Sequence, residues 1–251
     1  MSKFNTTELN VDFFGKIIKM NIFDYDYYAK NNINDEGLDI ISKCLESGNN
    51  CWEPYQTEIT KEILKDGNNI FVDIGSHLGY YSLLSAALGN HVYSIDSSEV
   101  YNSLFRRSIY ANRMENIKIH KKRVNERFSL DEIISSDTDI KLIKCDIEGY
   151  EIEFVDSIFD RLKNHNIENL ILEISPTIRS NYPEYVLKIK NLGYNVYDIG
   201  LSPQRKLNEY MKLSSLQDRL LQINDMEQMT RYINGFPEKQ SNFLFSINKY
   251  K

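Results

Sequence analysis

The sequence has few of the residues that mark special classes of protein. Its 251 residues include 3 cysteines, 5 prolines and 1 tryptophan. No two of Cys44, Cys51 and Cys145 have the spacing of metal ligands; Cys44 and Cys51 could pair, but we expect reduced thiols, as in most cytosolic proteins. No apolar run reaches the roughly 18 residues of a membrane-spanning helix, and no basic and apolar leader opens the sequence. We therefore expect a cytoplasmic protein without a membrane span.

Positive charge is in deficit as well. The chain has 30 Lys and Arg residues against 36 Asp and Glu residues, a net charge of -6. A negative net charge gives no general attraction to nucleic acid or acidic membranes. A local patch of basic residues is still compatible with it, because net charge does not show how the charges are distributed over the surface. A hydrophobic fraction of 41% is ample for a core, and the length suits one α/β domain with extensions.

Strand-like and helix-like segments alternate from residue 69 onward, in the rhythm of βαβ units. The patterns predict strands at 69–74, 91–96, 117–120, 140–146, 170–174, 193–199 and 242–247, and helices at 57–64, 80–88, 99–111, 129–134, 150–162 and 184–192. Residues 200–240 are polar and are predicted as an insertion. The domain organisation that follows is an N-terminal extension of strands and a helix over 1–55, then an α/β domain over 56–251.

Within the N-terminal extension, residues 11–23 alternate between polar and apolar like a strand. Gly15 is expected to bend this strand or to mark a bulge. Residues 24–34 are rich in Tyr, Asp and Asn and are predicted as a loop. Residues 36–48 are predicted as a helix.

The glycine loop after the strand at 69–74 is the first candidate for a ligand site. The strand ends near Asp73, and Gly75 and Gly79 follow before a helix-like segment. A backbone approaches a ligand closely only where a side chain is absent, and a helix N-terminus offers free N–H groups. The loop alone is a weak motif for a nucleotide-like ligand.

Asp96, at the end of the next strand, narrows the choice of ligand. It follows Asp73 at about the distance at which dinucleotide-binding folds place a ribose-binding acid. Those folds need Gly-x-Gly-x-x-Gly, however, and the loop from Gly75 to Gly79 lacks the middle glycine that admits a pyrophosphate. A ligand with ribose and adenine but no phosphate suits the loop better. S-adenosylmethionine is such a ligand, and its cationic centre favours a site rich in acids.

Acids recur at the carboxyl ends of the predicted strands, at Asp73, Asp96, Asp146 and Glu173. Ligands of an open parallel sheet bind outside these ends. Each acid alone could cap the helix that follows it. Carboxylates are costly to bury without partners, so four of them at one edge favour a ligand site.

The third candidate is the run Lys144-Cys145-Asp146-Ile147-Glu148-Gly149-Tyr150-Glu151. In an extended strand Lys144, Asp146 and Glu148 share one side. A lysine beside two acids can set their pKa values apart, as acid–base chemistry requires. An ion pair with a cap at a strand-to-helix turn is the structural alternative. Two acids without a third ligand are weak evidence for a divalent cation, and we predict no metal site.

Together these motifs resemble those of the FkbM-type methyltransferases. The matching segments are 71–82, 129–133 and 143–151, with support from Trp52-Glu53-Pro54, Asn112, Asn116-Ile117 and 170–174, and a weaker match at 241–247. The resemblance covers about residues 50–175. It implies a class I methyltransferase (Rossmann-like) fold, with a seven-stranded, mostly parallel sheet, an antiparallel last strand and helices on both faces. It also implies S-adenosylmethionine as methyl donor and, usually, a hydroxyl group on a sugar or secondary metabolite as acceptor.

The resemblance and the loop chemistry assign roles to individual residues. Asp73 and the loop backbone are expected to hold the methionine end of the donor, and Asp96 the ribose. An alcohol needs a base as it is methylated, and we assign that role to Asp146 or Glu148, with Lys144 tuning it. The complete set assigned to the cofactor is Asp73, Gly75, Ser76, His77, Gly79, Tyr80, Asp96 and Ser97.

Two positions depart from the family pattern. Ser76-His77 stands where a small residue and Asn are common, and Asp96-Ser97 stands where Glu-Pro is common. Asp still accepts hydrogen bonds from both ribose hydroxyls. His77 could contact the methionine carboxylate or simply start the helix.

Other functions stay open. The chain could bind S-adenosylmethionine without catalysis, as a partner subunit. A nucleic-acid methyltransferase is disfavoured by the acidic charge and by the absence of an Asn/Asp-Pro-Pro-Tyr-like motif, and a nicotinamide oxidoreductase by the missing glycine. We expect a small-molecule or glycan acceptor and no nucleic-acid partner, while a homodimer stays open.

Overall fold

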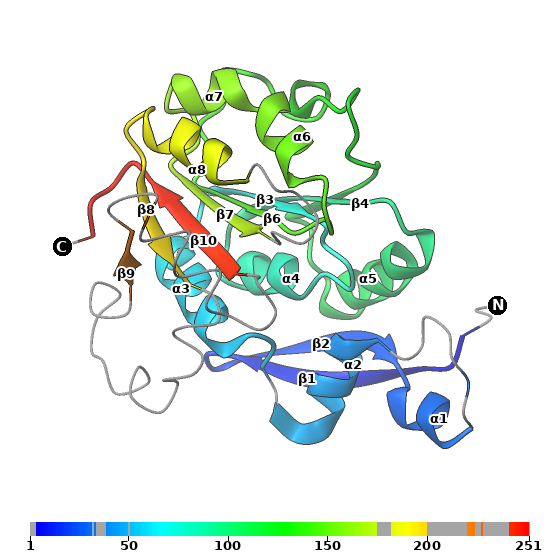
Figure 1. The fold of residues 1–251 in the computed structure, drawn as a ribbon. Helices are drawn as coiled ribbons and strands as arrows, with labels where there is room; N and C mark the ends of the chain where they lie inside the picture. Colours follow the sequence, from blue (N-terminus) through cyan, green and yellow to red (C-terminus); the bar gives the residue numbers. More distant parts are fainter. Residues whose placement is uncertain are drawn as a thin grey trace.

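The computed structural model describes residues 4–31, 33, 39–49, 51–174, 182–199, 220–223, 227 and 241–250. These residues form a two-stranded hairpin and a central eight-stranded sheet with helices on both faces (Figure 1). None of the helices in this part of the chain is long and apolar enough to cross a membrane.

The central sheet has the strand order β5-β4-β3-β6-β7-β10-β8-β9 in the described residues. Parallel pairs join β3 (Ile70–Ile74), β4 (His91–Asp96), β5 (Ile117–Lys121), β6 (Leu142–Cys145) and β7 (Asn169–Ile174). β10 (Ser241–Ser246) lies antiparallel between β7 and β8 (Asn195–Asp198), and β9 (Leu221–Gln222) adds a two-residue edge. The predicted seven-stranded sheet with an antiparallel last strand is confirmed, and β9 extends it.

Two hydrophobic cores cover the two faces of this sheet. The side chains of a strand alternate, so Phe71 of β3 enters one core and Val72 enters the other, each 0% exposed. Burial on both faces explains why β3 reads as a continuous apolar run rather than as an alternating one.

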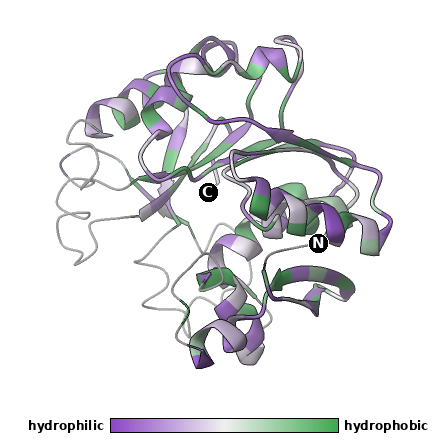
Figure 2. Cartoon of the chain, turned by 90° about the vertical axis from the view of Figure 1, so that its right-hand side faces the viewer, coloured by the Kyte–Doolittle hydropathy of each residue, from purple (hydrophilic) through white to green (hydrophobic). Residues whose placement is uncertain are grey.

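Among the described residues, helices pack on both faces of the sheet (Figure 1). On one side lie α3 (Pro54–Leu64), α4 (Tyr80–Ala87) and α5 (Glu99–Asn112); on the other lie α6 (Glu151–Ser157), α7 (Phe159–Lys163) and α8 (Tyr182–Lys190). Hydrophobic and hydrophilic residues both occur along the helices, as is typical of amphipathic helices (Figure 2). The helix predicted over 150–162 is divided at Ile158 into α6 and α7, and the one over 129–134 shrinks to the short turn η3 (Leu130–Glu132).

The predicted first strand is a hairpin of β1 (Thr6–Phe13) and β2 (Lys16–Phe23). Phe14 and Gly15 form its turn with φ values of 55° and 88°, so the bend expected at Gly15 reverses the chain. Met20 and Ile22 of β2 are 0% exposed and join the core that contains α4 and α5. The hairpin thus packs against the sheet domain.

The segment after the hairpin differs from its prediction. Residues 24–34 were expected to form a loop, but α1 (Tyr25–Lys30) occupies most of it because Asp24 accepts a 2.9 Å hydrogen bond from the amide of Tyr27. The helix predicted over 36–48 is represented by α2 (Ile40–Cys44) and the turn η2 (Leu45–Asn49), while residues 34–38 lie outside the described residues. Most of the predicted 200–240 insertion also lies outside them, and the domain boundary at residue 55 stays a prediction.

Candidate active site

A cavity of about 520 Å³ opens at the carboxyl ends of β3, β4 and β6. The predicted site residues that line it are Asp73, Gly75, Ser76, His77, Tyr80, Asp96, Ser97, Lys144, Asp146 and Glu148. Gly79 is the exception, because it lies at the N-cap of α4 and packs inward. The structure therefore brings together residues that are more than 70 positions apart in the chain.

The glycines of the loop are required by packing inside the protein. A Cβ atom on Gly75 would lie 1.8 Å from the carbonyl oxygen of Asp146, and one on Gly79 would lie 2.3 Å from the ring of Phe105. Both glycines have positive φ, 77° and 82°. The turn from β3 to α4 can therefore lie against β6 and α5 only with glycine at these two positions.

Asp73 is a buried carboxyl group with one free oxygen. It is 1% exposed, and its Oδ2 accepts a 2.6 Å hydrogen bond from the Ser82 hydroxyl. Its Oδ1 has no hydrogen-bond partner among the described residues. Burial raises the pKa of Asp73 to about 6, because it outweighs the attraction of Lys144 and the hydrogen bond from Ser82. Asp73 can therefore still accept a hydrogen bond from a ligand or form an ion pair with a cation.

Lys144 supplies the cation at the centre of the acidic cluster. Its side chain is 5% exposed, and its Nζ lies 3.0 Å from Oδ2 of Asp146 and 5.1 Å from the ring centroid of Tyr81. Burial lowers the pKa of Lys144, but Asp146, Asp73 and Glu53 outweigh burial and raise it above the usual value. Lys144 therefore stays charged at neutral pH.

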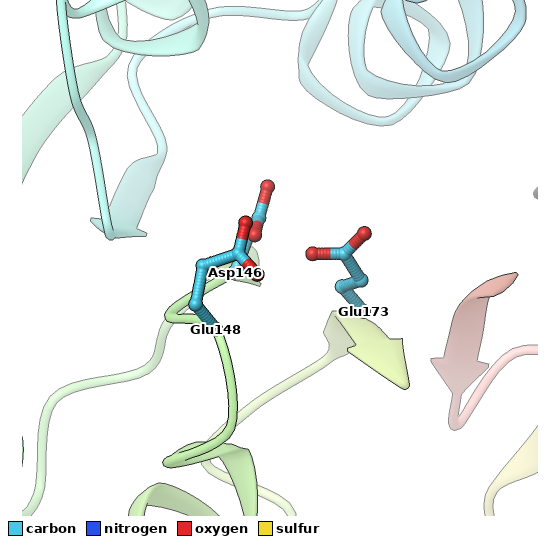
Figure 3. Close-up of side chains that lie close together, drawn as sticks. All are labelled: Asp146, Glu148 and Glu173. Carbon is cyan, nitrogen blue, oxygen red and sulfur yellow. The ribbon is translucent and has the colours of Figure 1, made fainter. Parts of the chain in front are cut away.

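Three acids lie close together, as Figure 3 shows: Asp146, Glu148 and Glu173. Each can place one carboxylate oxygen within 4.8 Å of the others. Burial raises the pKa of Asp146, but Lys144 and a hydrogen bond with Glu173 outweigh it and lower the pKa to about 2. Burial and the neighbouring Asp146 raise the pKa of Glu173 far above its usual value. Glu173 therefore keeps its proton and shares it with Asp146.

The sequence reasoning on these acids needs two corrections. Strand β6 ends at Cys145, and Glu148 lies beyond it in a left-handed turn with φ of 53°, so Glu148 does not follow the strand alternation. The acidic motif after β6 was also expected to lack a third ligand for a divalent cation, whereas Glu173 of β7 provides one. These three acids could hold a metal ion. The Lys144 ammonium already neutralises Asp146, however, and Glu173 is neutral because it is protonated.

Glu151, the last acid of the motif, has a structural role. It is 9% exposed, and its carboxylate accepts hydrogen bonds from the amides of Ile147 at 3.0 Å and Gly149 at 2.9 Å. These bonds fix the turn between β6 and α6, which carries Glu148 into the cavity.

Asp96 is oriented by the backbone on both of its oxygens. The amide of His77 donates to Oδ2 at 2.9 Å, and the amide of Ser98 donates to Oδ1 at 2.7 Å. Each carboxylate oxygen keeps a second lone pair, so two hydroxyl groups of a ligand can still donate to Asp96. The ribose role assigned to Asp96 stays a prediction.

His77 does not start the helix, because α4 begins at Tyr80 with Gly79 as its N-cap. Its ring packs against Tyr101, with the ring centroids 3.7 Å apart, and its Nε2 lies 3.4 Å from Oδ1 of Asp39. Burial lowers the pKa of His77 and outweighs the opposing attraction of Asp39. A neutral His77 therefore links the glycine loop to the N-terminus of α2.

Sequence reasoning missed several residues around the cavity. The lining also includes Asp39, Ile40, Ile41, Trp52, Tyr81, Ile95, Ser98, Tyr101, Lys122, Arg123, Val124, Ile147 and Tyr150. A signal was available for Lys122 and Arg123, since they directly follow β5 at its carboxyl end, the edge at which open parallel sheets bind ligands. No periodicity could have shown that Trp52, Tyr81 and Lys144 line one cavity.

The chain is similar to known methyltransferases in sequence and in fold. Residues 43–196, more than half of the chain, match the family model described as the methyltransferase FkbM domain. No curated protein sequence matches the chain.

The similar solved structures share the fold at low sequence identity. An rRNA methylase from Streptococcus thermophilus is 15% identical, with a TM-score of 0.50 over 75% of this chain and 92% of that one. A candidate methyltransferase from Streptococcus mutans, in complex with SAH, is 12% identical, with a TM-score of 0.50 over 75% and 96%. A candidate rRNA methylase from Clostridium thermocellum is 8% identical, with a TM-score of 0.51 over 76% and 93%.

Proposed function

This chain belongs to the FkbM methyltransferase family, and we propose that it transfers a methyl group from S-adenosylmethionine to a hydroxyl group of a sugar or small metabolite. The donor would occupy the cavity at the ends of β3, β4 and β6. It supplies an electrophilic methyl group on a sulfonium, which leaves S-adenosylhomocysteine after transfer.

The observation that carries this proposal is the excess of carboxyl groups over buried cations at the cavity. Lys144 faces Asp73 and Asp146, which line the cavity, and Glu53 behind its wall. Asp73 retains an oxygen without a partner among the described residues, in a position that burial makes unfavourable for a lone charge. The ammonium and sulfonium groups of S-adenosylmethionine would compensate such an excess, and a neutral or anionic ligand would not.

The residues on the cavity divide into two roles. Asp73 and the loop backbone would bind the methionine end of the donor. Asp96, which two backbone amides already orient, would accept hydrogen bonds from the ribose hydroxyls. Holding donor and acceptor in line supplies much of the rate of a displacement.

Proton removal from the acceptor falls to the acids near Lys144. Asp146 already accepts from Lys144 and shares a proton with Glu173, whereas Glu148 is exposed. Glu148 is therefore the preferred base, with Asp146 as the second choice. Lys144 would keep Asp146 ionised and in place.

Incubation with tritiated S-adenosylmethionine and a panel of acceptors tests this function. The panel contains monosaccharides, methyl glycosides, nucleosides and RNA oligonucleotides. Label in a sugar that survives alkali identifies a methyl ether and supports the proposal. Label found only in the RNA, on a base or on a ribose, would establish the nucleic-acid alternative instead, and donor binding without transfer to any member would support a non-catalytic partner subunit.

A further inference from the structure

Glu53 lies immediately behind the cavity wall and makes an unusual set of contacts. Its Oε2 accepts a 2.7 Å hydrogen bond from the Tyr81 hydroxyl and a 2.9 Å bond from Nε2 of Gln56. Burial raises the pKa of Glu53. A hydrogen bond with the Trp52 side chain opposes this rise, because it stabilises the charged carboxylate. Glu53 does not line the cavity, whereas both Trp52 and Tyr81 do.

The backbone at Glu53 is shaped to make these contacts. Its φ and ψ are 40° and 68°, in the left-handed region that residues with a side chain rarely adopt. Glu53 is the N-cap residue of α3, yet its side chain makes no capping hydrogen bond. The carboxylate is directed to Tyr81 of α4 instead, so a strained conformation is kept for a contact across the fold.

Glu53 also acts on Lys144. It is one of the three carboxylates that raise the pKa of this lysine, and the Lys144 ammonium lies 5.1 Å from the ring centroid of Tyr81, the same ring whose hydroxyl binds Glu53. Lys144 therefore contacts Asp146 directly and also lies near the Glu53–Tyr81 pair. The position of its ammonium relative to Asp146 depends on both.

We propose that Glu53 is a positioning residue for methyl transfer, whose carboxylate fixes Trp52 and Tyr81 as the cavity wall and holds Lys144 against Asp146. This inference rests on the proposed function of the cavity. Glu53 touches neither donor nor acceptor and acts through Trp52, Tyr81 and Lys144. Loss of its charge should therefore affect turnover more than donor affinity.

Trp52 makes the positioning role measurable, because it is the only tryptophan of the chain. The charged groups that face Glu53 are Lys144 and Asp146, and its neutral neighbours are Tyr81, Gln56 and Trp52. Because burial raises the pKa of Glu53, Trp52 fluorescence should titrate above the ordinary range of a glutamate. Glu53→Gln keeps the size of the side chain and an accepting oxygen but should abolish this titration, while Asp73→Asn should retain it. If the fluorescence of Trp52 changed with pH in the same way in the wild type and in Glu53→Gln, the contact between Glu53 and Trp52 would be refuted.

Kinetics then separate positioning from general stability. Glu53→Gln should lower kcat roughly 10- to 100-fold, because small displacements at a reacting centre are costly. Its dissociation constant for S-adenosylmethionine, measured by calorimetry, should stay within about threefold of wild type. Tyr81→Phe should reproduce part of the kcat loss. Glu62→Gln is the matched control and should be unchanged, because Glu62 lies on the same helix and its one ion pair among the described residues is with Lys65 at 3.0 Å.

The outcomes distinguish this proposal from the function on which it rests. Wild-type protein that binds no S-adenosylmethionine would refute the proposed function. Wild-type protein that binds and transfers methyl groups, with Glu53→Gln equally active per binding site, would refute the role of Glu53 alone. Counting donor sites by calorimetry corrects for any unfolded fraction of the variant.

Discussion

Gly75 lies against Asp146 so closely that a Cβ atom would come within 1.8 Å of the Asp146 carbonyl oxygen. The loop after β3 and the acidic motif after β6 are thus one packed unit, although the sequence presents them as two motifs. A backbone oxygen cannot move aside as a flexible side chain can. The contact explains why the turn needs glycine even without a ligand.

Gly75→Ala should destabilise the protein by about 3 kcal/mol or more, since it adds a backbone clash to an unfavourable φ. Gly15→Ala is the matched control, because Gly15 also has positive φ (88°) but nothing lies within 4 Å of a Cβ placed there. It should cost about 1–2 kcal/mol. Urea denaturation of both variants measures the difference, and equal losses would contradict the clash.

Asp73 should give the protein an unusual dependence of stability on pH. Its pKa is about 6 in the folded protein against an ordinary value of 3.8, so the folded state binds this proton more tightly than the unfolded state. The contribution to stability is then largest below pH 3.8 and is lost as the pH rises through about 6. Asp73→Asn should raise the unfolding free energy at pH 7.5 by roughly 2–3 kcal/mol. A variant less stable than wild type at that pH would show that Lys144 and Ser82 outweigh burial.

The same carboxyl group should make donor binding depend on pH in the opposite direction. A cationic ligand favours ionised Asp73, so binding below the pKa of about 6 must release a proton. The affinity for S-adenosylmethionine should therefore fall about tenfold per pH unit below pH 6. Calorimetry in buffers of different ionisation enthalpy should detect the released proton. An affinity independent of pH between 5 and 7.5 would remove Asp73 from the site.

Glu151 should contribute to stability and to the placement of Glu148. Glu151→Ala leaves the amides of Ile147 and Gly149 without their acceptor and should cost about 2 kcal/mol. Thermal unfolding measures this loss, with Glu126→Ala in an exposed loop as the control. If turnover per folded molecule were undiminished, Glu148 would not need the turn that Glu151 holds.

Removing divalent cations should leave methyl transfer unchanged. Asp146, Glu148 and Glu173 can bring their oxygens within 4.8 Å of one another, but the Lys144 ammonium already lies 3.0 Å from Asp146. A metal ion would have to compete with that charge and displace the proton of Glu173. Activity lost in EDTA and restored by Mg²⁺ would show that the three acids bind a metal after all.

Much of the sheet was predictable because buried parallel strands and their helices leave strong patterns. The gathering of acids at one edge of the sheet was predictable too, since Asp73, Asp96 and Asp146 each lie within one residue of the end of a strand. Other features depend on contacts that sequence spacing does not encode. The partnership of Asp146 with Glu173 needs the pairing of β6 with β7. Residues 25–30 form α1 instead of the predicted loop because the side chain of Asp24 caps the helix, a signal that the Tyr-, Asp- and Asn-rich composition of 24–34 obscures.

The central claim is that this cavity binds S-adenosylmethionine through Asp73 and Asp96, and calorimetric titration of the wild-type chain at pH 7.5 tests it most directly. We predict one donor molecule per chain, with binding weakened at least about tenfold in Asp96→Ala and in Asp73→Ala and unchanged in Asp66→Ala, in the exposed turn that follows α3. No binding to the wild-type chain, or equal binding by all four proteins, would contradict the account.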